Sequence, residues 1–131
     1  MTFPDYKFKN IKSFSKSYFK EYAKASASVD PRKLEIAAEL LLKSYQNTNV
    51  VYVCGNGGSA AISNHFACDH GKLLATDTEL LPRIHSLSSN IEVITAIAND
   101  ISYDEVYEHQ LKLAAKAGDV VITVSSSGDS E

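Results

Sequence analysis

The segment Val50-Val51-Tyr52-Val53-Cys54-Gly55-Asn56-Gly57-Gly58-Ser59 decides the fold of this 131-residue chain. Its first half, residues 50–54, is a continuous run of apolar, β-favouring residues, which is typical of a strand buried on both faces of a parallel sheet. Its second half interrupts the strand with three glycines and leads into a helical pattern from Ala60 to about Leu74. The segment therefore predicts a strand, a tight glycine loop and a helix in direct succession.

The same alternation of strand and helix continues towards the C-terminus. Ser102-Tyr103-Asp104-Glu105 matches the capping box that begins many helices, and Gly118 is a typical residue just after a helix. The predicted elements are a weaker strand at 83–88, a short helix at 91–98 (where periodicity also allows a strand), a helix at 103–117 and a third buried strand at 120–124. This order predicts an α/β fold with a Rossmann-like or flavodoxin-like parallel sheet.

Two helices are predicted before the first strand. Residues 1–29 form one helical pattern with a stripe of large apolar side chains, and a second helix begins with Asp30 as its N-cap and Pro31 in its first turn. The stripe of the first helix contains Ile11, Phe14, Tyr18 and Tyr22, widened by Phe8, Phe19, Ala25 and Val29. Such wide stripes either cover a sheet or pack against another subunit. We expect one domain, with N-terminal helices in 1–48 and an α/β core in 49–131.

Composition excludes several classes of protein. The net charge of -3 gives no general attraction to nucleic acid or to anionic membranes. The apolar runs are shorter than the roughly 18 residues that a membrane span needs, and no export signal follows Met1. Cys54 and Cys68 have neither C-x-x-C nor metal-ligand spacing, so we expect buried, reduced thiols in a cytoplasmic protein.

The glycine loop Gly55–Ala60 is the first candidate site, because ligands bind at the carboxyl ends of strands in open parallel sheets. Its glycines let an anion approach the backbone, and the amides of the following helix point at that anion. The loop also satisfies the G-x-G-x-x-A spacing of dinucleotide-binding proteins. That fingerprint requires an acid at the end of the second strand, where this chain has Ser88, Ser89 and Asn90. We therefore expect no nucleotide cofactor.

The second candidate site is the serine-rich loop after the third strand. Ser125, Ser126, Ser127 and Ser130 place four hydroxyls within six residues. Such an array can hold a phosphate monoester with neutral donors, although a serine-rich turn alone is more often a solvated linker. Its pairing with a glycine loop at another strand end favours a phosphate site.

These motifs resemble the SIS (sugar isomerase) domain family, and most closely its phosphoheptose isomerase branch, which interconverts sedoheptulose 7-phosphate and heptose 7-phosphate. The similarity runs in the same order from about residue 30 to the end of the chain. It is carried by residues 54–61 with Asn64-His65-Phe66-Ala67, by Ala98-Asn99-Asp100, and by residues 124–130.

The resemblance implies a role for each matching residue. The sugar phosphate would be held by Ser125, Ser126, Ser127 and Ser130, with Asn56, Gly57, Gly58 and Ser59 closing that pocket. Asp100 would face the sugar hydroxyls. The family's His-x-x-x-Glu pair falls on His65 and Asp69, which are zinc ligands in metal-binding members, and the acid also moves a proton during isomerisation.

The residues themselves support part of this picture. A spacing of four places His65 and Asp69 on one helix face, where they could bind one metal, share a proton path or form a plain surface pair.

Two residues depart from the family's pattern. Asp69 is one methylene shorter than the family's glutamate, which retracts the carboxylate by about 1.5 Å. A displacement of that size can cost about a hundredfold in rate. Ile62 also replaces an acid that the isomerases usually carry.

The leading prediction is a cytoplasmic sugar-phosphate isomerase that works through an enediol, assembles as a homo-oligomer (a tetramer in the family) and has zinc as its candidate cofactor. The alternatives are a non-catalytic SIS module that binds a sugar phosphate or a protein partner, and a purely structural oligomerising domain. The chain is expected to be truncated after its third strand. The family's remaining ligands and catalytic histidine would then lie beyond residue 131, and an apolar sheet edge would be exposed.

Overall fold

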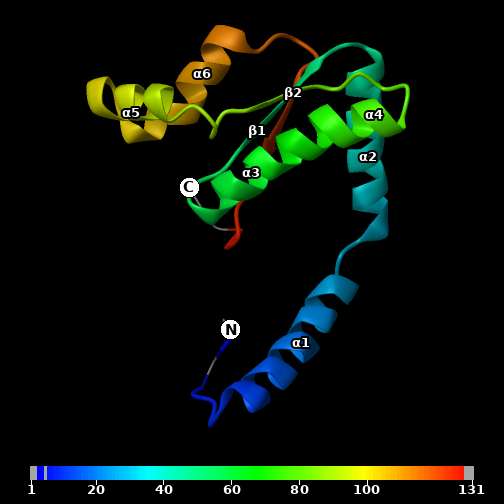
Figure 1. Ribbon diagram of the computed structural model, residues 1–131, viewed down its shortest axis with the longest axis vertical. Helices are drawn as coiled ribbons and strands as arrows, with labels where there is room; N and C mark the ends of the chain where they lie inside the picture. Colours follow the sequence, from blue (N-terminus) through cyan, green and yellow to red (C-terminus); the bar gives the residue numbers. More distant parts are fainter. Residues whose placement is uncertain (1–2, 5, 129–131) are drawn as a thin grey trace. The chain divides into compact units, whose positions relative to one another are not determined.

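The central strand β1 (Val50–Cys54) is hydrogen-bonded in parallel to a neighbour on each side. The computed structural model describes residues 3–4 and 6–128, and within them the strand order is β2-β1-β3 (Figure 1). β2 (Arg83–Ser86) pairs Ile84 with Val51, and β3 (Val120–Thr123) pairs Val121 with Tyr52. The predicted parallel α/β sheet is confirmed.

Helix α3 (Gly58–Asp69) covers one face of β1. Val51 and Val53 on this face are 0% exposed. The helix approaches closely because the residues that it buries are small, namely Ser59 and Ser63. The buried Ser63 hydroxyl donates a 2.9 Å hydrogen bond to the Ser59 carbonyl oxygen, so it has a partner inside the core.

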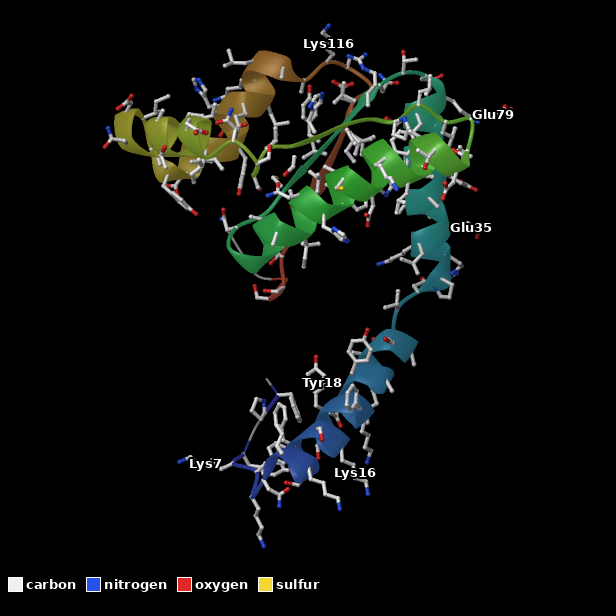
Figure 2. The ribbon with its side chains drawn as sticks, in the orientation of Figure 1. Lys7, Lys16, Tyr18, Glu35, Glu79 and Lys116 are labelled. Atoms are coloured by element: carbon white, nitrogen blue, oxygen red, sulfur yellow. The ribbon has the colours of Figure 1, made fainter. Side chains whose placement is uncertain are left out.

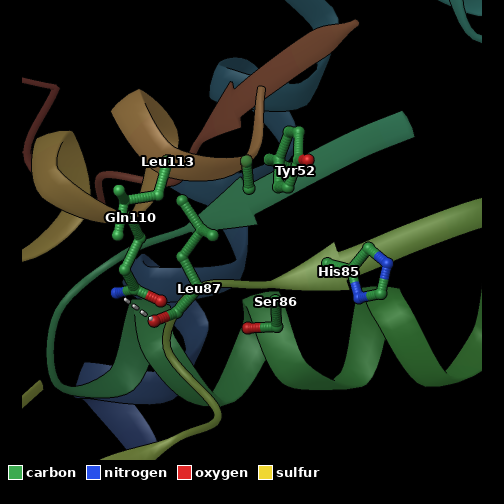
Figure 3. Close-up of a pocket in the computed structure, with 7 residues that line it drawn as sticks. Tyr52, His85, Ser86, Leu87, Gln110 and Leu113 are labelled. Atoms are coloured by element: carbon green, nitrogen blue, oxygen red, sulfur yellow. Dashed lines mark hydrogen bonds between the residues drawn. The ribbon is translucent and has the colours of Figure 1, made fainter. Parts of the chain in front are cut away.

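Helix α6 (Val106–Ala114) covers part of the opposite face, and α5 (Ile91–Asp100) packs against α6. Tyr107 and Leu111 of α6 pack on a cluster formed by Val50, Tyr52, Cys54 and Leu87. A groove of about 370 Å³ remains beside them, and Gln110 donates a 3.2 Å hydrogen bond to the Leu87 carbonyl at its wall (Figure 3). The groove is lined by Tyr52, His85, Ser86, Leu87, Gln110, Leu113 and Ala114.

The outer strands differ from their predictions. β2 ends at Ser86 rather than residue 88, and β3 ends at Thr123 rather than residue 124. The prediction that the third strand is buried is wrong, since its residues alternate between half-buried and exposed and Val121 is 45% exposed. The cause is position: β3 lies at the sheet edge, and Val121 shares with Tyr52 the face that α6 covers only in part.

The helix predicted at 103–117 is shorter than expected. Ser102 accepts a 3.2 Å hydrogen bond from the Asp104 amide, which begins a 3₁₀ turn (η2, Tyr103–Glu105) before α6. The Glu105 carboxylate lies 3.6 Å from the Lys112 ammonium instead of completing a capping box. At the other end α6 stops at Ala114, ahead of the predicted residue 117.

Two further helices form where the sequence predicts them, but one of them extends beyond its predicted end. The helix at α5 is confirmed, and Asn90 caps it by accepting a 3.0 Å hydrogen bond from the Val93 amide. The helix after the glycine loop runs past residue 74: α3 is followed by a π-helical turn (η1, His70–Leu74) and then by α4 (Ala75–Asp77). A π-helical turn has no period in the sequence that could have predicted it.

The chain divides into two compact units between Ile36 and Ala37, inside α2 (Pro31–Gln46). In the first unit, α1 (Ile11–Ala27) begins ten residues later than predicted. Asn10 caps it by accepting a 2.9 Å hydrogen bond from the Ser13 amide, and Phe8 folds back so that its ring centroid lies 5.4 Å from that of Phe14. No helix within residues 3–4 and 6–128 is long and apolar enough to cross a membrane.

In the second unit, a buried tyrosine ties the end of α2 to the π-helical turn. The Tyr45 hydroxyl lies 2.6 Å from His70 Nδ1, and the His70 ring stacks on Phe66 at 3.9 Å. Burial lowers the pKa of His70 and raises the pKa of Tyr45, which favours neutral partners. The two cysteines are free thiols as expected, but only Cys54 is buried; Cys68 is exposed, which corrects its prediction.

Asp119 joins the starts of β1 and β3, and this contact predicts a pH dependence of stability. Its carboxylate accepts 2.8 Å hydrogen bonds from the Val50 and Lys116 amides, and these bonds hold the pKa of Asp119 below its ordinary value of 3.8. The stabilisation is therefore complete above that ordinary value and is lost as the pH falls through the lower pKa of the folded state. We expect Asp119→Asn to be less stable than wild type at neutral pH and to lose less stability on acidification.

Urea unfolding measures this difference when it is followed from neutral pH down through 3.8, the ordinary pKa of an aspartate, and on into more acidic solution. Asp77→Asn, which removes an exposed carboxylate from α4, is the matched control and should follow wild type. An Asp119→Asn curve parallel to that of wild type across the whole range would contradict the assignment.

Candidate functional site

The loops that follow β1 and β3 lie against each other at the carboxyl ends of these neighbouring strands. The Val124 amide donates a 2.8 Å hydrogen bond to the Cys54 carbonyl, which extends the strand pairing to the start of the serine loop. A Cβ on Gly55 would lie 2.8 Å from the Val124 carbonyl oxygen and 2.7 Å from the Ser59 Cβ. Residue 55 must therefore be glycine for the two loops to meet.

The glycine loop ends at the N-terminus of α3 and is open on its outer side. Gly57 has φ +55, which favours glycine, and the helix begins at Gly58. The first amides of a helix have no acceptor inside it and, with the helix dipole, stabilise an anion. A Cβ on Gly57 or Gly58 would meet nothing within 4 Å, so a ligand can approach these two residues. Ser59 is instead buried beneath the loop.

The serine loop is a compact turn beside Gly55. The Gly128 amide donates a 3.1 Å hydrogen bond to Ser125 Oγ, which lies 3.4 Å from Ser127 Oγ. Gly128 has φ +75 and closes the turn. Ser125, Ser126 and Ser127 are thus gathered at the strand end that the prediction requires. Ser130, the fourth predicted phosphate contact, lies outside the described residues.

Two residues that were not candidate site residues, Ser88 and Tyr107, hold the glycine loop through hydrogen bonds to Gly55. The Tyr107 hydroxyl donates a 2.6 Å hydrogen bond to the Gly55 carbonyl oxygen and also lies 2.8 Å from Asn56 Oδ1. The Ser88 hydroxyl accepts a 3.1 Å hydrogen bond from the Gly55 amide and donates a 2.9 Å hydrogen bond to the Gly55 carbonyl. The position of Ser88 just after the second strand was a usable signal. Nothing in the sequence distinguishes Tyr107 from an ordinary core tyrosine.

Asp100 stands apart from the two loops. It ends α5, it is exposed, and its Oδ1 accepts a 2.7 Å hydrogen bond from the side-chain Nδ2 of Asn99. Within residues 3–4 and 6–128, no hydrogen bond or ion pair joins Asp100 to either loop. Its contact with sugar hydroxyls stays a prediction.

His65 and Asp69 form the predicted pair, but on the outer surface of α3. His65 Nε2 lies 3.4 Å from Asp69 Oδ2, and the two side chains are 77% and 42% exposed. Ile62, one turn earlier, is 57% exposed. The described residues thus place the pair on an exposed face of α3, and its role in metal binding or proton transfer stays a prediction.

The pair by itself does not fit a zinc ion. Imidazole nitrogen and carboxylate oxygen are both common zinc ligands, but zinc sites use three or four protein ligands. The described part of the chain contains no group of three or more histidine, cysteine or acidic side chains that could hold a metal. His65 and Asp69 would supply at most part of such a site.

The close approach at Gly55 yields a test of the paired loops. We expect Gly55→Ala to lower the free energy of unfolding by about 1–3 kcal/mol, because the new methyl group forces the Ser59 side chain or the Val124 carbonyl away. Gly58→Ala adds the same methyl group where nothing lies within 4 Å, so its stability should stay within about 1 kcal/mol of wild type. Urea unfolding measures both, and equal effects of the two substitutions would contradict the contact.

Comparison with known proteins gives a consistent family. The family model described as the SIS domain matches residues 17–131. The phosphoheptose isomerase of Clostridium acetobutylicum is 39% identical over 99 residues, which cover 76% of this chain and 50% of that protein. The phosphoheptose isomerase of Alteromonas mediterranea is 38% identical over 106 residues, covering 81% of this chain and 53% of that protein.

Solved structures agree with the sequence relatives. A phosphoheptose isomerase from Neisseria gonorrhoeae has a TM-score of 0.76 and 31% identity, covering 92% of this chain and 64% of that one. Another from Francisella tularensis has a TM-score of 0.78 and 27% identity, covering 93% and 65%. The chain spans about half the length of the curated relatives that it matches. Since the family model covers most of the chain and the fold agrees with solved members, this chain belongs to the SIS domain family.

Proposed function

We propose that the protein containing this chain is a sugar-phosphate isomerase of the phosphoheptose type, which interconverts sedoheptulose 7-phosphate and heptose 7-phosphate. The observation that carries the proposal is the contact between the two loops, in which Gly55 lies against the Val124 carbonyl directly before the serine turn. Relatives and solved neighbours named as phosphoheptose isomerases support it.

The paired loops suit a phosphate monoester. The Gly57 and Gly58 amides at the start of α3 and the hydroxyls of the serine turn are neutral donors at neighbouring strand ends. The next amides of α3, those of Ser59 and Ala60, already donate to the Asn56 and Gly57 carbonyls. A hydrogen bond to a charged group contributes about 1.5–3 kcal/mol, so several such donors hold a phosphate without a cationic side chain. Gly57 and Gly58 leave room for the phosphate to reach the backbone.

The isomerisation moves one proton between two carbons and one between two oxygens, and it needs no external reductant or oxidant. In the proposal, the Asp69 carboxylate removes a proton from the hydroxyl-bearing carbon beside the carbonyl, and the carbonyl oxygen takes a proton from water, which gives an enediol. Asp69 then returns its proton to the former carbonyl carbon while the other enediol hydroxyl gives its proton to water, so that the carbonyl and hydroxyl groups exchange places. His65, at 3.4 Å, would position the Asp69 carboxylate.

Zinc belongs to the proposal, with ligands in addition to those that the described residues supply. Further ligands would have to join His65 and Asp69, and zinc would then stabilise negative charge on the substrate oxygens.

Assembly into a homo-oligomer, a tetramer in the proposal, is supported by aromatic side chains on α1, where Tyr18, Phe19 and Tyr22 are exposed. Tyr18 and Lys16 project from different sides of this helix (Figure 2). The proposed setting is the cytoplasm, and the partner is a phosphorylated sugar rather than nucleic acid or membrane.

A second candidate is a SIS module that binds the phosphosugar without converting it. The observation that favours it is the surface position of the His65–Asp69 pair, with the exposed and apolar Ile62 one turn away. A general base needs a position beside the reacting carbon, and the pair lacks an enclosing wall among the described residues.

Asp69→Asn separates the two candidates. If Asp69 is the base, we expect turnover of sedoheptulose 7-phosphate to fall at least about a hundredfold, while binding measured by calorimetry changes less than about threefold. Assays of wild type and variant are run with a chelator and with added zinc. Asp77→Asn, which removes another exposed carboxylate, should leave turnover unchanged.

The results distinguish an isomerase from a module that only binds the phosphosugar. Undiminished turnover in Asp69→Asn would contradict the assignment of the base. Tight binding by wild type with no turnover under either metal condition would establish the binding module. Absence of both binding and turnover would contradict the proposed function itself.

A further inference from the structure

The peptide group that joins Gly55 to Asn56 is held by two hydroxyls from outside the glycine loop. The Ser88 hydroxyl donates a 2.9 Å hydrogen bond to the Gly55 carbonyl oxygen, and the Tyr107 hydroxyl donates a second one at 2.6 Å. A carbonyl oxygen has two lone pairs, so these two bonds satisfy it fully. The Gly55 amide also donates to the Ser88 oxygen at 3.1 Å. Two side chains thus fix the direction in which the Gly55 carbonyl points.

The residues on either side of this peptide would otherwise allow it to rotate. Because the peptide unit is planar, a flip turns ψ of the residue before it and φ of the residue after it by about half a turn. Glycine tolerates such a change, and asparagine is among the residues that most readily adopt a positive φ. Within the described residues, Thr48 is the one non-glycine residue with a positive φ, so Asn56 has the opposite sign. Residues 55 and 56 therefore permit two peptide orientations, and the two hydroxyls select one.

Only one of these orientations suits a bound phosphate. Tyr107 belongs to α6, which packs on the face of the sheet opposite to α3, so the Gly55 carbonyl is directed to the side away from α3. The open residues Gly57 and Gly58 lie at the start of α3, where the phosphate is proposed to bind. A flip would turn the carbonyl oxygen towards that region, and its partial negative charge would repel the anion.

We propose that Ser88 and Tyr107 are positioning residues for phosphate binding, because they lock the peptide between residues 55 and 56 with its carbonyl oxygen turned away from the anion. Neither side chain contacts the ligand. The inference rests on the proposed function, since it places the phosphate of a phosphorylated sugar on the two loops. It adds that the affinity of these loops depends on two hydroxyls that lie outside them.

Calorimetry on the full chain tests the lock with inorganic phosphate and with sedoheptulose 7-phosphate. Ser88→Ala and Tyr107→Phe each remove one hydrogen bond to the Gly55 carbonyl, and the double variant removes both. A carbonyl without these partners is stabilised by turning towards water, so the orientation that binds phosphate becomes a minor population. We expect the double variant to bind both ligands at least about fivefold more weakly, and each single variant to lose less.

NMR reads the orientation of the peptide directly. The three-bond coupling between the amide and α protons of Asn56 reports its φ, averaged over both orientations. We expect this coupling to change in the double variant and to return to the wild-type value when inorganic phosphate saturates the protein. The Tyr107 hydroxyl also lies 2.8 Å from Asn56 Oδ1, so Ser88→Ala, which leaves that contact in place, should show the same change in smaller measure. A mere loss of stability would leave the coupling of the folded protein unchanged.

Two control substitutions remove similar groups nearby without affecting the Gly55 carbonyl. Ser89→Ala removes a hydroxyl that donates to the Ser86 carbonyl at 2.8 Å, and Tyr103→Phe removes the hydroxyl of an exposed tyrosine. Both should bind phosphate within about twofold of wild type. Ser88→Thr keeps the hydroxyl and should recover most of the affinity that Ser88→Ala loses. Thermal unfolding by circular dichroism identifies a variant that fails to fold, and the two single variants decide if the double variant does so.

The inference and the proposed function fail in different ways. Unchanged phosphate affinity in the variants, or weaker binding with no change in the Asn56 coupling, would show that the two hydroxyls do not act through this peptide. A loss confined to the phosphosugar would also overturn the inference, because the lock acts on the phosphate. These results would leave the phosphate loops in place. Wild type that binds neither ligand would overturn the proposed function and the inference together.

Discussion

The structure depends on the close approach of Gly55 to the carbonyl of Val124. Parallel pairing of β1 with β3, continued by the bond between Val124 and Cys54, brings the two strands to an end at the same edge of the sheet. The glycine at position 55 lets the chain turn there without pushing the strands apart. One backbone contact therefore places a helix N-terminus and a serine turn side by side, which is the condition for holding a phosphate between them.

Two further residues also hold the glycine loop. Ser88 after β2 and Tyr107 in α6 bind the Gly55 carbonyl, so with Val124 after β3 three separate parts of the chain meet at Gly55. A loop held by that many bonds is preorganised, and little ordering is left for the ligand to impose. The His65–Asp69 pair lacks such support among the described residues, since it lies on the solvent side of α3. The loops proposed to bind phosphate are thus held by more hydrogen bonds than the pair proposed to carry out the isomerisation.

Much of this arrangement could be predicted from local patterns. The apolar run at 50–54 and the glycines after it were sufficient for the strand, the loop and the parallel sheet, because burial on both faces leaves little choice of residues. Predictions failed where distant residues decide the outcome. The burial of Val121 depends on how far α6 extends over the sheet, and the hydrogen bond from Tyr107 to the Gly55 carbonyl joins residues 52 positions apart. The exposure of His65 likewise depends on what packs against the outer face of α3. A spacing of four residues predicts only that His65 and Asp69 share a helix face, not whether that face is covered.

The most direct test of the central claim is to follow backbone amides by NMR while sedoheptulose 7-phosphate is added to the full chain. If the two loops form one phosphate site, the amides of Gly57 and Gly58 and those of residues 126–128 should shift together along a single binding curve. Amides around the groove of Tyr52 and Gln110 should move less. Shifts confined to one loop, or centred on that groove, would contradict the account.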